Sequence, residues 1–130
     1  MTKSSDLAET VRAWLAHIES IIAGQIDPST NDAFLVMTDA YPESQPELAW
    51  RGILLALADA KSEKVVGVIG AGALETLMTH HGKSYIDLVE REAGHNARLR
   101  SALEHVWNIH DVDVRDRVRQ VCTRGEGKPS

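Results

Sequence analysis

Apolar residues recur with helical spacing along most of the chain. The first stretch follows the i, i+3, i+4, i+7 rule closely and can end at Gly24; its apolar positions are Leu7, Val11, Trp14, Leu15, Ile18, Ile21 and Ile22. Similar spacing recurs over about residues 32–41, 46–60, 63–70, 73–81, 84–93, 97–107 and 112–122. The pattern therefore predicts an all-α chain of six to eight helices.

Polar residues mark where several of these helices begin. Ser62, Asn96 and Asp111 each precede an apolar run, and their side chains can accept hydrogen bonds from the first unpaired N–H groups of a helix. The β-branched run at 65–69 also fits a strand, but no other segment offers a partner strand. We therefore expect this run to be helical as well.

Proline and glycine mark where helices are expected to stop. Pro42 should end the helix over 32–41, because proline cannot continue the hydrogen-bond ladder. Gly70 and Gly72 predict a break or kink. Gly82 fits the left-handed position that closes a helix, and Ser84 can cap the next one. The stretch "MTHHGKSYIDLVE" is thus predicted to form the turn of a helical hairpin.

The connections between these helices are short, which favours antiparallel neighbours and therefore αα-hairpins. Residues 1–124 are expected to form a single helical domain, and residues 125–130 a disordered tail. Two architectures fit this pattern. Two or three stacked hairpins would resemble a short solenoid of the HEAT type, whereas the lack of a clear sequence repeat fits an irregular helical bundle.

Charge is distributed unevenly along the chain. The formal net charge is −5, and residues 1–50 contain only two basic residues against eight acidic ones. Arg115, Arg117 and Arg119 decorate the last helix, but aspartates are interleaved with them and cancel much of their field. Nucleic-acid binding is therefore disfavoured, because contacts to phosphates need clustered Lys and Arg.

Cys122 is the only cysteine, which rules out an intramolecular disulfide and a thiolate zinc site. The N-terminus lacks the apolar core of a signal peptide, and no apolar run approaches the length of a membrane span. We therefore expect a cytoplasmic protein with no membrane partner. The sequence leaves its oligomeric state open.

Five of the six histidines lie between residues 80 and 110, which raises the question of a metal or acid–base site; they are His80, His81, His95, His105 and His110. Adjacent helical residues diverge by about 100°, so His80 and His81 cannot easily grip one metal. No H-E-x-x-H or Glu-x-x-His pair occurs. We expect no metal and no cofactor, with His80 solvated at a helix end and His81 facing the core.

Other catalytic patterns are also missing from the sequence. The doublet His110-Asp111 is similar to one element of metal phosphohydrolases, but Asp111 is better explained as a helix cap. There is no G-x-S-x-G nucleophile motif, and the glycines at 67–72 do not have dinucleotide-binding spacing. The chain therefore shows no catalytic residues by pattern.

An acidic group in the first half of the chain is a candidate binding surface. Its members occupy turns and helix starts, and if they converge they could receive a basic partner; they are Asp27, Asp32, Asp39, Glu43 and Glu47. Trp14, Trp50 and Trp107 occupy apolar helical positions and are expected in the core. Trp50, beside Arg51, has the alternative of being an exposed interface anchor.

The stretch "AGALETLMTHHGKSYIDLVEREA" contains an A-G-x-L-E-x-L-x-x-x-H-G pattern, formed by Ala71, Gly72, Leu74, Glu75, Leu77, His81 and Gly82. Together with "PELAWRGIL" and "LRSALEHVW", it resembles an uncharacterised bacterial family of domain-of-unknown-function proteins over about residues 44–107. The resemblance implies a small helical protein, of a kind associated with bacterial toxin–immunity loci. It implies no chemistry, and the motif residues are interpreted as structural.

Two functional hypotheses follow. The first is a non-enzymatic helical module that binds another protein, as an immunity-type protein or an adaptor. The second is a metal- or His/Glu-dependent hydrolase, or a small-ligand-binding domain, centred on Glu75 and His81. The lack of a catalytic constellation favours the first, and an open pocket around these side chains would favour the second.

Overall fold

The computed structural model describes residues 3–25 and 28–126, which are helical along most of their length and contain no strand. The α-helices are α1 (Lys3–Ile22), α2 (Asn31–Leu35), α3 (Tyr41–Ser44), α4 (Pro46–Asp59), α5 (Glu63–Ile69), α6 (Glu75–Ala93), α7 (Ala97–Leu103) and α8 (Val112–Glu126). A short 3₁₀ turn, η1 (Pro28–Thr30), precedes α2, and two π turns are η2 (Val36–Ala40) and η3 (Gly70–Leu74). The expected single all-α domain is confirmed.

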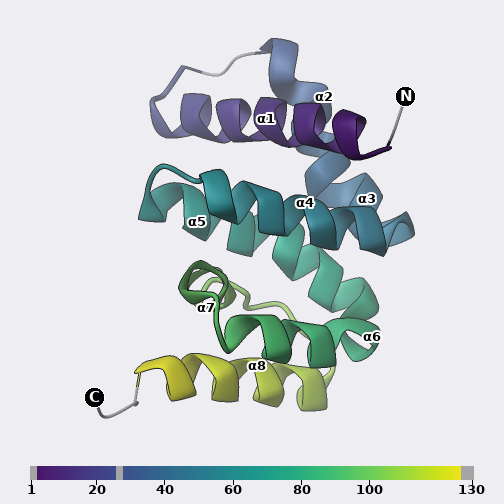
Figure 1. Cartoon of the computed structure of the whole chain (residues 1–130), viewed down its shortest axis with the longest axis vertical. Coiled ribbons are helices and arrows are strands. Elements are labelled where there is room, and N and C mark those ends of the chain that lie inside the picture. Colours follow the sequence, from purple (N-terminus) through teal and green to yellow (C-terminus); the bar gives the residue numbers. More distant parts are fainter. Residues whose placement is uncertain (1–2, 26–27, 127–130) are drawn as a thin grey trace.

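The helices are stacked in layers along the longest axis of the molecule (Figure 1). Helices α1 and α2 lie at one end, α4 and α5 cross the middle, and α8 covers the opposite end. Helix α4 contacts α1, α3, α5, α6 and α7, which explains why its sequence is apolar nearly all round. None of the described helices is both long and apolar enough to span a membrane.

The core runs through every layer of this stack. It is built from the apolar stripes of the helices, and its fully buried side chains include Trp14, Ile18, Met37, Ile53, Leu57, Leu77, Leu99 and Leu103. Trp14 and Trp50 are buried as expected. The expectation that Trp107 packs in the core is wrong, because this side chain is 73% exposed in the connection between α7 and α8.

Three expected helix caps are present. The Ser62 hydroxyl accepts the Val65 N–H at 3.3 Å, and the Asn96 amide oxygen accepts the Leu99 N–H at 3.0 Å. Asp111 Oδ1 accepts the Val114 N–H at 3.1 Å. Each bond satisfies a backbone donor that has no partner within its own helix. Helix α8 reaches Glu126, two residues into the expected tail, and residues 127–130 lie outside the described part of the chain.

The helix expected to stop at Pro42 instead continues through a π turn, and the break or kink expected at Gly70 and Gly72 is also a π turn. The backbone stays helical from Asn31 to Ser44, and η2 lies directly before Tyr41-Pro42. A π turn widens the helix by one residue, which accommodates a ring that lacks an N–H donor. In the same way, η3 joins α5 to α6, so residues 63–93 form one interrupted helix.

The predicted hairpin turn at Gly82 is also wrong. Helix α6 runs through this point with a kink at His81, whose φ of −132° and ψ of 22° are not helical. Gly82 is buried against α8, where an added Cβ would lie 2.9 Å from Val114 Cγ1. Among the described residues the left-handed glycine is Gly24, with φ 76°, which ends α1 as expected. Gly82 therefore permits a close helix contact rather than a chain reversal.

Helix α8 is tied to α6 by an arginine that faces two carboxylates. Arg117 donates from Nη2 to Asp87 Oδ1 at 2.6 Å and from Nε to Glu90 Oε2 at 3.0 Å. These bonds to Glu90 and Asp87 raise the pKa of the Arg117 guanidinium above its ordinary value. The central arginine of the α8 series therefore holds the last layer in place.

Candidate functional site

The connection between α7 and α8 carries the exposed Trp107, and Glu75 on α6 fixes its backbone. Glu75 Oε2 accepts the N–H of Trp107 at 2.8 Å and the N–H of Asn108 at 3.1 Å. The Thr79 hydroxyl lies 3.0 Å from the Asn108 carbonyl oxygen. Val106 and Ile109 on either side are buried in the core. The loop is thus held at four successive residues, 106–109.

Trp107 is the most exposed of the large hydrophobic side chains in the described part of the chain. An indole presents a large apolar surface with one polar N–H, and contact of that apolar surface with water is unfavourable. A fixed backbone beneath an exposed indole is an arrangement typical of interface anchors. Trp107 is therefore the first element of the candidate site.

A surface hollow of about 350 Å³ lies beside this loop and forms the second element. Its lining comes from the start of α6 and from the loop itself, namely Glu75, Thr76, Thr79, His80, Asn108 and His110. We call it the α6 hollow. Its volume falls at the lower end of the roughly 300–1,000 Å³ range of ligand pockets. Every lining residue is polar, so the hollow suits a polar or charged group.

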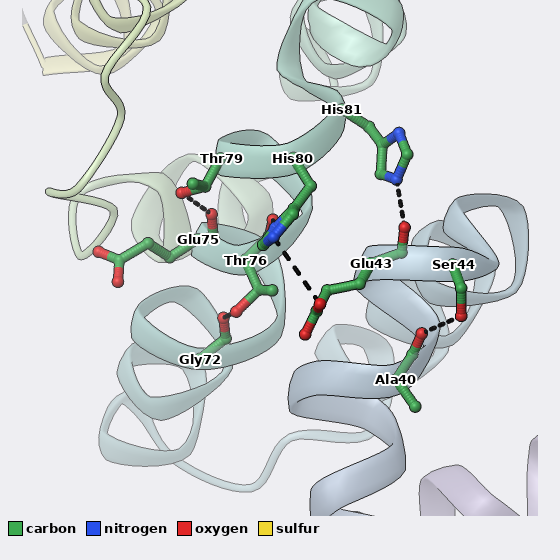
Figure 2. A network of polar contacts seen from close by, with 9 residues as sticks. All are labelled: Ala40, Glu43, Ser44, Gly72, Glu75, Thr76, Thr79, His80 and His81. Atoms are coloured by element: carbon green, nitrogen blue, oxygen red, sulfur yellow. Dashed lines mark hydrogen bonds and ion pairs between the residues drawn. The ribbon is translucent and has the colours of Figure 1, made fainter.

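The hydrogen atoms of several lining groups are already committed to the backbone. Thr76 Oγ1 donates to the Gly72 carbonyl at 3.0 Å, and Thr79 Oγ1 lies 2.7 Å from the Glu75 carbonyl (Figure 2). His80 Nδ1 lies 3.0 Å from the Thr76 carbonyl oxygen. Because a carbonyl oxygen only accepts, Nδ1 carries the hydrogen in this contact. These bonds orient the side chains without any ligand.

The two neighbouring histidines act separately. His81 Nε2 donates to the backbone carbonyl oxygen of Glu43 at 2.7 Å, whereas His80 Nε2 lies 3.9 Å from the Glu43 carboxylate (Figure 2). His81 is half-buried and outside the core, and it points away from Glu75. The expectation that His81 faces the core is therefore wrong. Its ring instead joins the α6 kink to the end of α3.

The acidic residues expected to form a binding surface are distributed over several elements, and the four that the structure describes are exposed. Asp32, Asp39, Glu43 and Glu47 lie on α2, η2, α3 and α4, and Asp27 lies outside the described residues. Among them, Glu43 reaches the His80 ring at the edge of the candidate site. Burial raises the pKa of the Tyr85 hydroxyl, and the nearby charge of Glu47 raises it further.

Trp50, the expected alternative anchor, is only 8% exposed and packs with its ring centroid 6.3 Å from that of Tyr85. Trp50 therefore belongs to the core, as expected, and its alternative as an exposed anchor is wrong. A signal for Trp107 was present, because Asn108 and Asp111 directly after it are residues that favour turns and helix starts. They mark the segment as a connection rather than the last turn of a helix.

The motif residues around this site divide between core and surface. Leu74 and Leu77 are fully buried, Gly72 lies in the η3 turn, and Glu75 holds the loop. In residues 3–25 and 28–126, no three His, Cys, Asp or Glu side chains are grouped closely enough to hold a metal ion. The polar groups of the α6 hollow can form hydrogen bonds and ionic contacts with a ligand.

A family described as a family of unknown function (DUF6869) matches residues 25–125. This match is wider than the stretch 44–107 on which the sequence resemblance rested, and it includes α2 to α7 and nearly all of α8. No curated protein and no solved structure matches the chain. Helix α1 lies outside the matched region, although Trp14 and Ile18 on it are fully buried in the core.

Proposed function

The chain belongs to DUF6869, a family of unknown function, and we propose that it is a non-enzymatic module that binds another protein. The observation that carries this proposal is Trp107, which is 73% exposed while its own backbone N–H is bound to Glu75. Tryptophan is among the residues that contribute most to protein interfaces when a partner covers it. A loop already fixed in place loses little further conformational freedom on binding.

The cellular role that best fits this proposal is that of an adaptor or an immunity-type protein in the bacterial cytoplasm. A stack of helical hairpins resembling a short HEAT-type solenoid would support such a role, since solenoids present extended surfaces to their partners. The motif from Ala71 to Gly82 then serves to build the surface. Glu75 fixes the loop, and His81 fixes the kink that follows.

Affinity capture from an extract of the source cells tests this proposal. The wild-type protein and two variants are immobilised at equal density, and the retained proteins are identified by mass spectrometry. Trp107→Ala removes the exposed indole, and Leu35→Ala is a matched control that shortens a 47% exposed side chain on α2, a helix that does not line the α6 hollow. We expect wild type and Leu35→Ala to retain the same protein and Trp107→Ala to lose it.

Two results would count against the proposal. Retention of no protein by the wild type would speak against an interaction module. Equal retention by all three proteins would show that binding does not use Trp107. Circular dichroism of each variant checks that the helical fold is intact, which is expected because both side chains are exposed.

A small-ligand-binding domain or a metal- or His/Glu-dependent hydrolase centred on Glu75 and His81 is a second candidate. The α6 hollow favours it, because Glu75, His80 and His110 all line that hollow. His81 donates to the Glu43 carbonyl instead, so the imidazoles at the hollow are those of His80 and His110. This candidate predicts turnover of model carboxylate or phosphate esters, with or without added Zn²⁺ or Mn²⁺. Absence of turnover would exclude the hydrolase, and turnover that both His80→Ala and His110→Ala leave unchanged would exclude the α6 hollow as its site.

A further inference from the structure

The geometry points to a specific ligand for the α6 hollow: we propose that it binds an arginine side chain of the partner protein, while residues flanking that arginine cover Trp107. This inference rests on the proposed function and names the chemistry of the partner. It follows from the hydrogen bonds of Glu75, Thr76, Thr79 and His80, four of the six residues that line the hollow.

The two threonines in the lining present acceptors. Thr76 Oγ1 donates its hydrogen to the Gly72 carbonyl, and Thr79 Oγ1 lies between the Glu75 carbonyl at 2.7 Å and the Asn108 carbonyl at 3.0 Å. A hydroxyl has one hydrogen and two lone pairs. Both hydroxyls therefore donate their hydrogen to backbone carbonyls, and each offers a ligand a lone pair.

The His80 ring behaves in the same way. Its Nδ1 hydrogen is donated to the Thr76 carbonyl oxygen, so in the neutral ring Nε2 offers a lone pair. The Glu43 carboxylate lies 3.9 Å from this Nε2 and adds a negative charge at the rim. The Glu43 carboxylate thus places a negative charge at the rim of the hollow, and this charge favours a cationic ligand.

Glu75 supplies negative charge inside the hollow. Its Oε2 atom accepts the N–H groups of Trp107 and Asn108, and these two bonds do not involve Oε1. Lys83, on the same helix, forms an ion pair with Asp111 at 3.3 Å rather than with Glu75. The α6 hollow therefore combines a carboxylate with several acceptors, and it complements a ligand that is both cationic and rich in N–H donors.

A guanidinium meets these requirements better than an ammonium or a metal ion. It carries five N–H donors in a fixed plane, whereas an ammonium is a compact point charge with three. No three metal-ligating side chains are grouped together in the described residues. The exposed Trp107 next to the hollow offers apolar surface to the residues beside the arginine, which favours a protein-borne guanidinium over a free small molecule.

Nuclear magnetic resonance with three capped tripeptides tests the inference. The first peptide is acetyl-Leu-Arg-Leu-amide. The second has citrulline in place of arginine, which keeps the shape but removes the charge, and the third has lysine; free L-arginine is a fourth probe. The reporters are the indole N–H of Trp107, assigned with Trp107→Phe, and the amide of Asn108. We expect saturable shifts with the arginine peptide, and at least about fivefold weaker binding for each other probe.

Two charge-removing variants provide the matched comparison. Glu75→Gln removes the charge from the hollow but keeps an oxygen that can accept the Trp107 and Asn108 N–H groups. Glu104→Gln removes the same charge from an exposed residue at the end of α7, which does not line the hollow. We expect Glu75→Gln to lower the affinity for the arginine peptide at least about fivefold, and Glu104→Gln to leave this affinity within about twofold of the wild-type value.

Several outcomes would overturn the inference. Equal affinity for the citrulline peptide would show that no cation is recognised. Equal losses in the two glutamate variants would show a diffuse charge effect rather than a site. Free arginine binding as tightly as the peptide would exclude a protein-borne ligand. If the peptide is inert while capture from the extract still depends on Trp107, the proposed function stands and the arginine site fails.

Discussion

Glu75 Oε2 lies 2.8 Å from the backbone nitrogen of Trp107, so a side chain at the start of α6 fixes the loop that exposes the indole. The two residues are 32 positions apart in the sequence. Since the same oxygen also accepts the Asn108 N–H, one carboxylate orders two consecutive peptide groups. The position of the exposed Trp107 indole should therefore depend on the Glu75 carboxylate.

Replacing Glu75 should therefore loosen this loop. Glu75→Ala leaves two backbone N–H groups to water, and we expect the free energy of unfolding to fall by about 1–2 kcal/mol, the scale of hydrogen bonds to a charged group at a half-exposed position. Glu75→Gln retains an acceptor and should keep more than half of that stability. Urea denaturation measures both values, and hydrogen exchange of the Trp107 and Asn108 amides should accelerate in Glu75→Ala.

Glu104→Ala is the control for loss of a surface charge. It removes an exposed glutamate near the same loop and should change stability by less than about 0.5 kcal/mol. If Glu75→Ala lowers the free energy of unfolding no more than Glu104→Ala does, and hydrogen exchange of the Trp107 amide is unchanged, the carboxylate does not hold the loop.

Local signals in the sequence predicted the helices and three of their starts. The caps at Ser62, Asn96 and Asp111 are each formed with a residue three positions later, so the information lies within one turn. The apolar stripe of α1 likewise predicted the core positions from Leu7 to Ile18, whereas Ile21 and Ile22 at its end are about 40% exposed. These features depend on neighbours in the sequence, and for this reason periodicity and capping chemistry were sufficient to find them.

The features that make the candidate site depend on contacts between distant segments. The kink at His81 is accompanied by a bond to the Glu43 carbonyl, 38 positions away, and Gly82 contacts Val114 of α8. Neither partner can be read from a local window, so the glycine was interpreted as a helix end. Trp107 fits the apolar spacing of α7, although α7 ends at Leu103, and its exposed position depends on the contact with Glu75, 32 residues away.

The close approach of η3 to α7 predicts that even a small side chain at Gly70 destabilises the fold. A Cβ at this position would collide with the backbone carbonyl of Ala102, which cannot move without shifting α7. We expect Gly70→Ala to lower the free energy of unfolding by about 2–3 kcal/mol, the usual scale of overpacking in a well-packed core. Thermal and urea denaturation would both report the loss.

Gly72→Ala is the matched control, because it lies in the same π turn. The nearest atom to a Cβ there is Thr38 Cγ2 at 3.4 Å, which is an ordinary contact. Alanine is favoured over glycine in helical backbone, so this variant should be neutral or more stable by up to about 1 kcal/mol. Equal effects at the two positions would show that η3 and α7 are not packed at the Ala102 carbonyl.

The cap of α8 predicts an acid-dependent contribution to stability. The Val114 N–H holds the pKa of Asp111 below its ordinary value, against the opposing effect of burial, and Lys83 lowers it further. Because the folded pKa lies below the unfolded one, the contribution is present above the unfolded pKa of about 3.9 and is lost as the pH falls through the folded pKa. Asp111→Asn keeps a capping oxygen but cannot titrate.

The measurement is the urea midpoint of wild type and Asp111→Asn at about pH 5.5 and about pH 2.5. All other carboxyl groups titrate in both proteins, so their effects cancel in the comparison. We expect the wild type to lose more stability on acidification than Asp111→Asn. Asp113→Asn, which removes a neighbouring charge from the first turn of α8 but leaves the cap, should keep the wild-type acid dependence. Equal acid dependence in wild type and Asp111→Asn would mean that the cap does not favour the charged carboxylate.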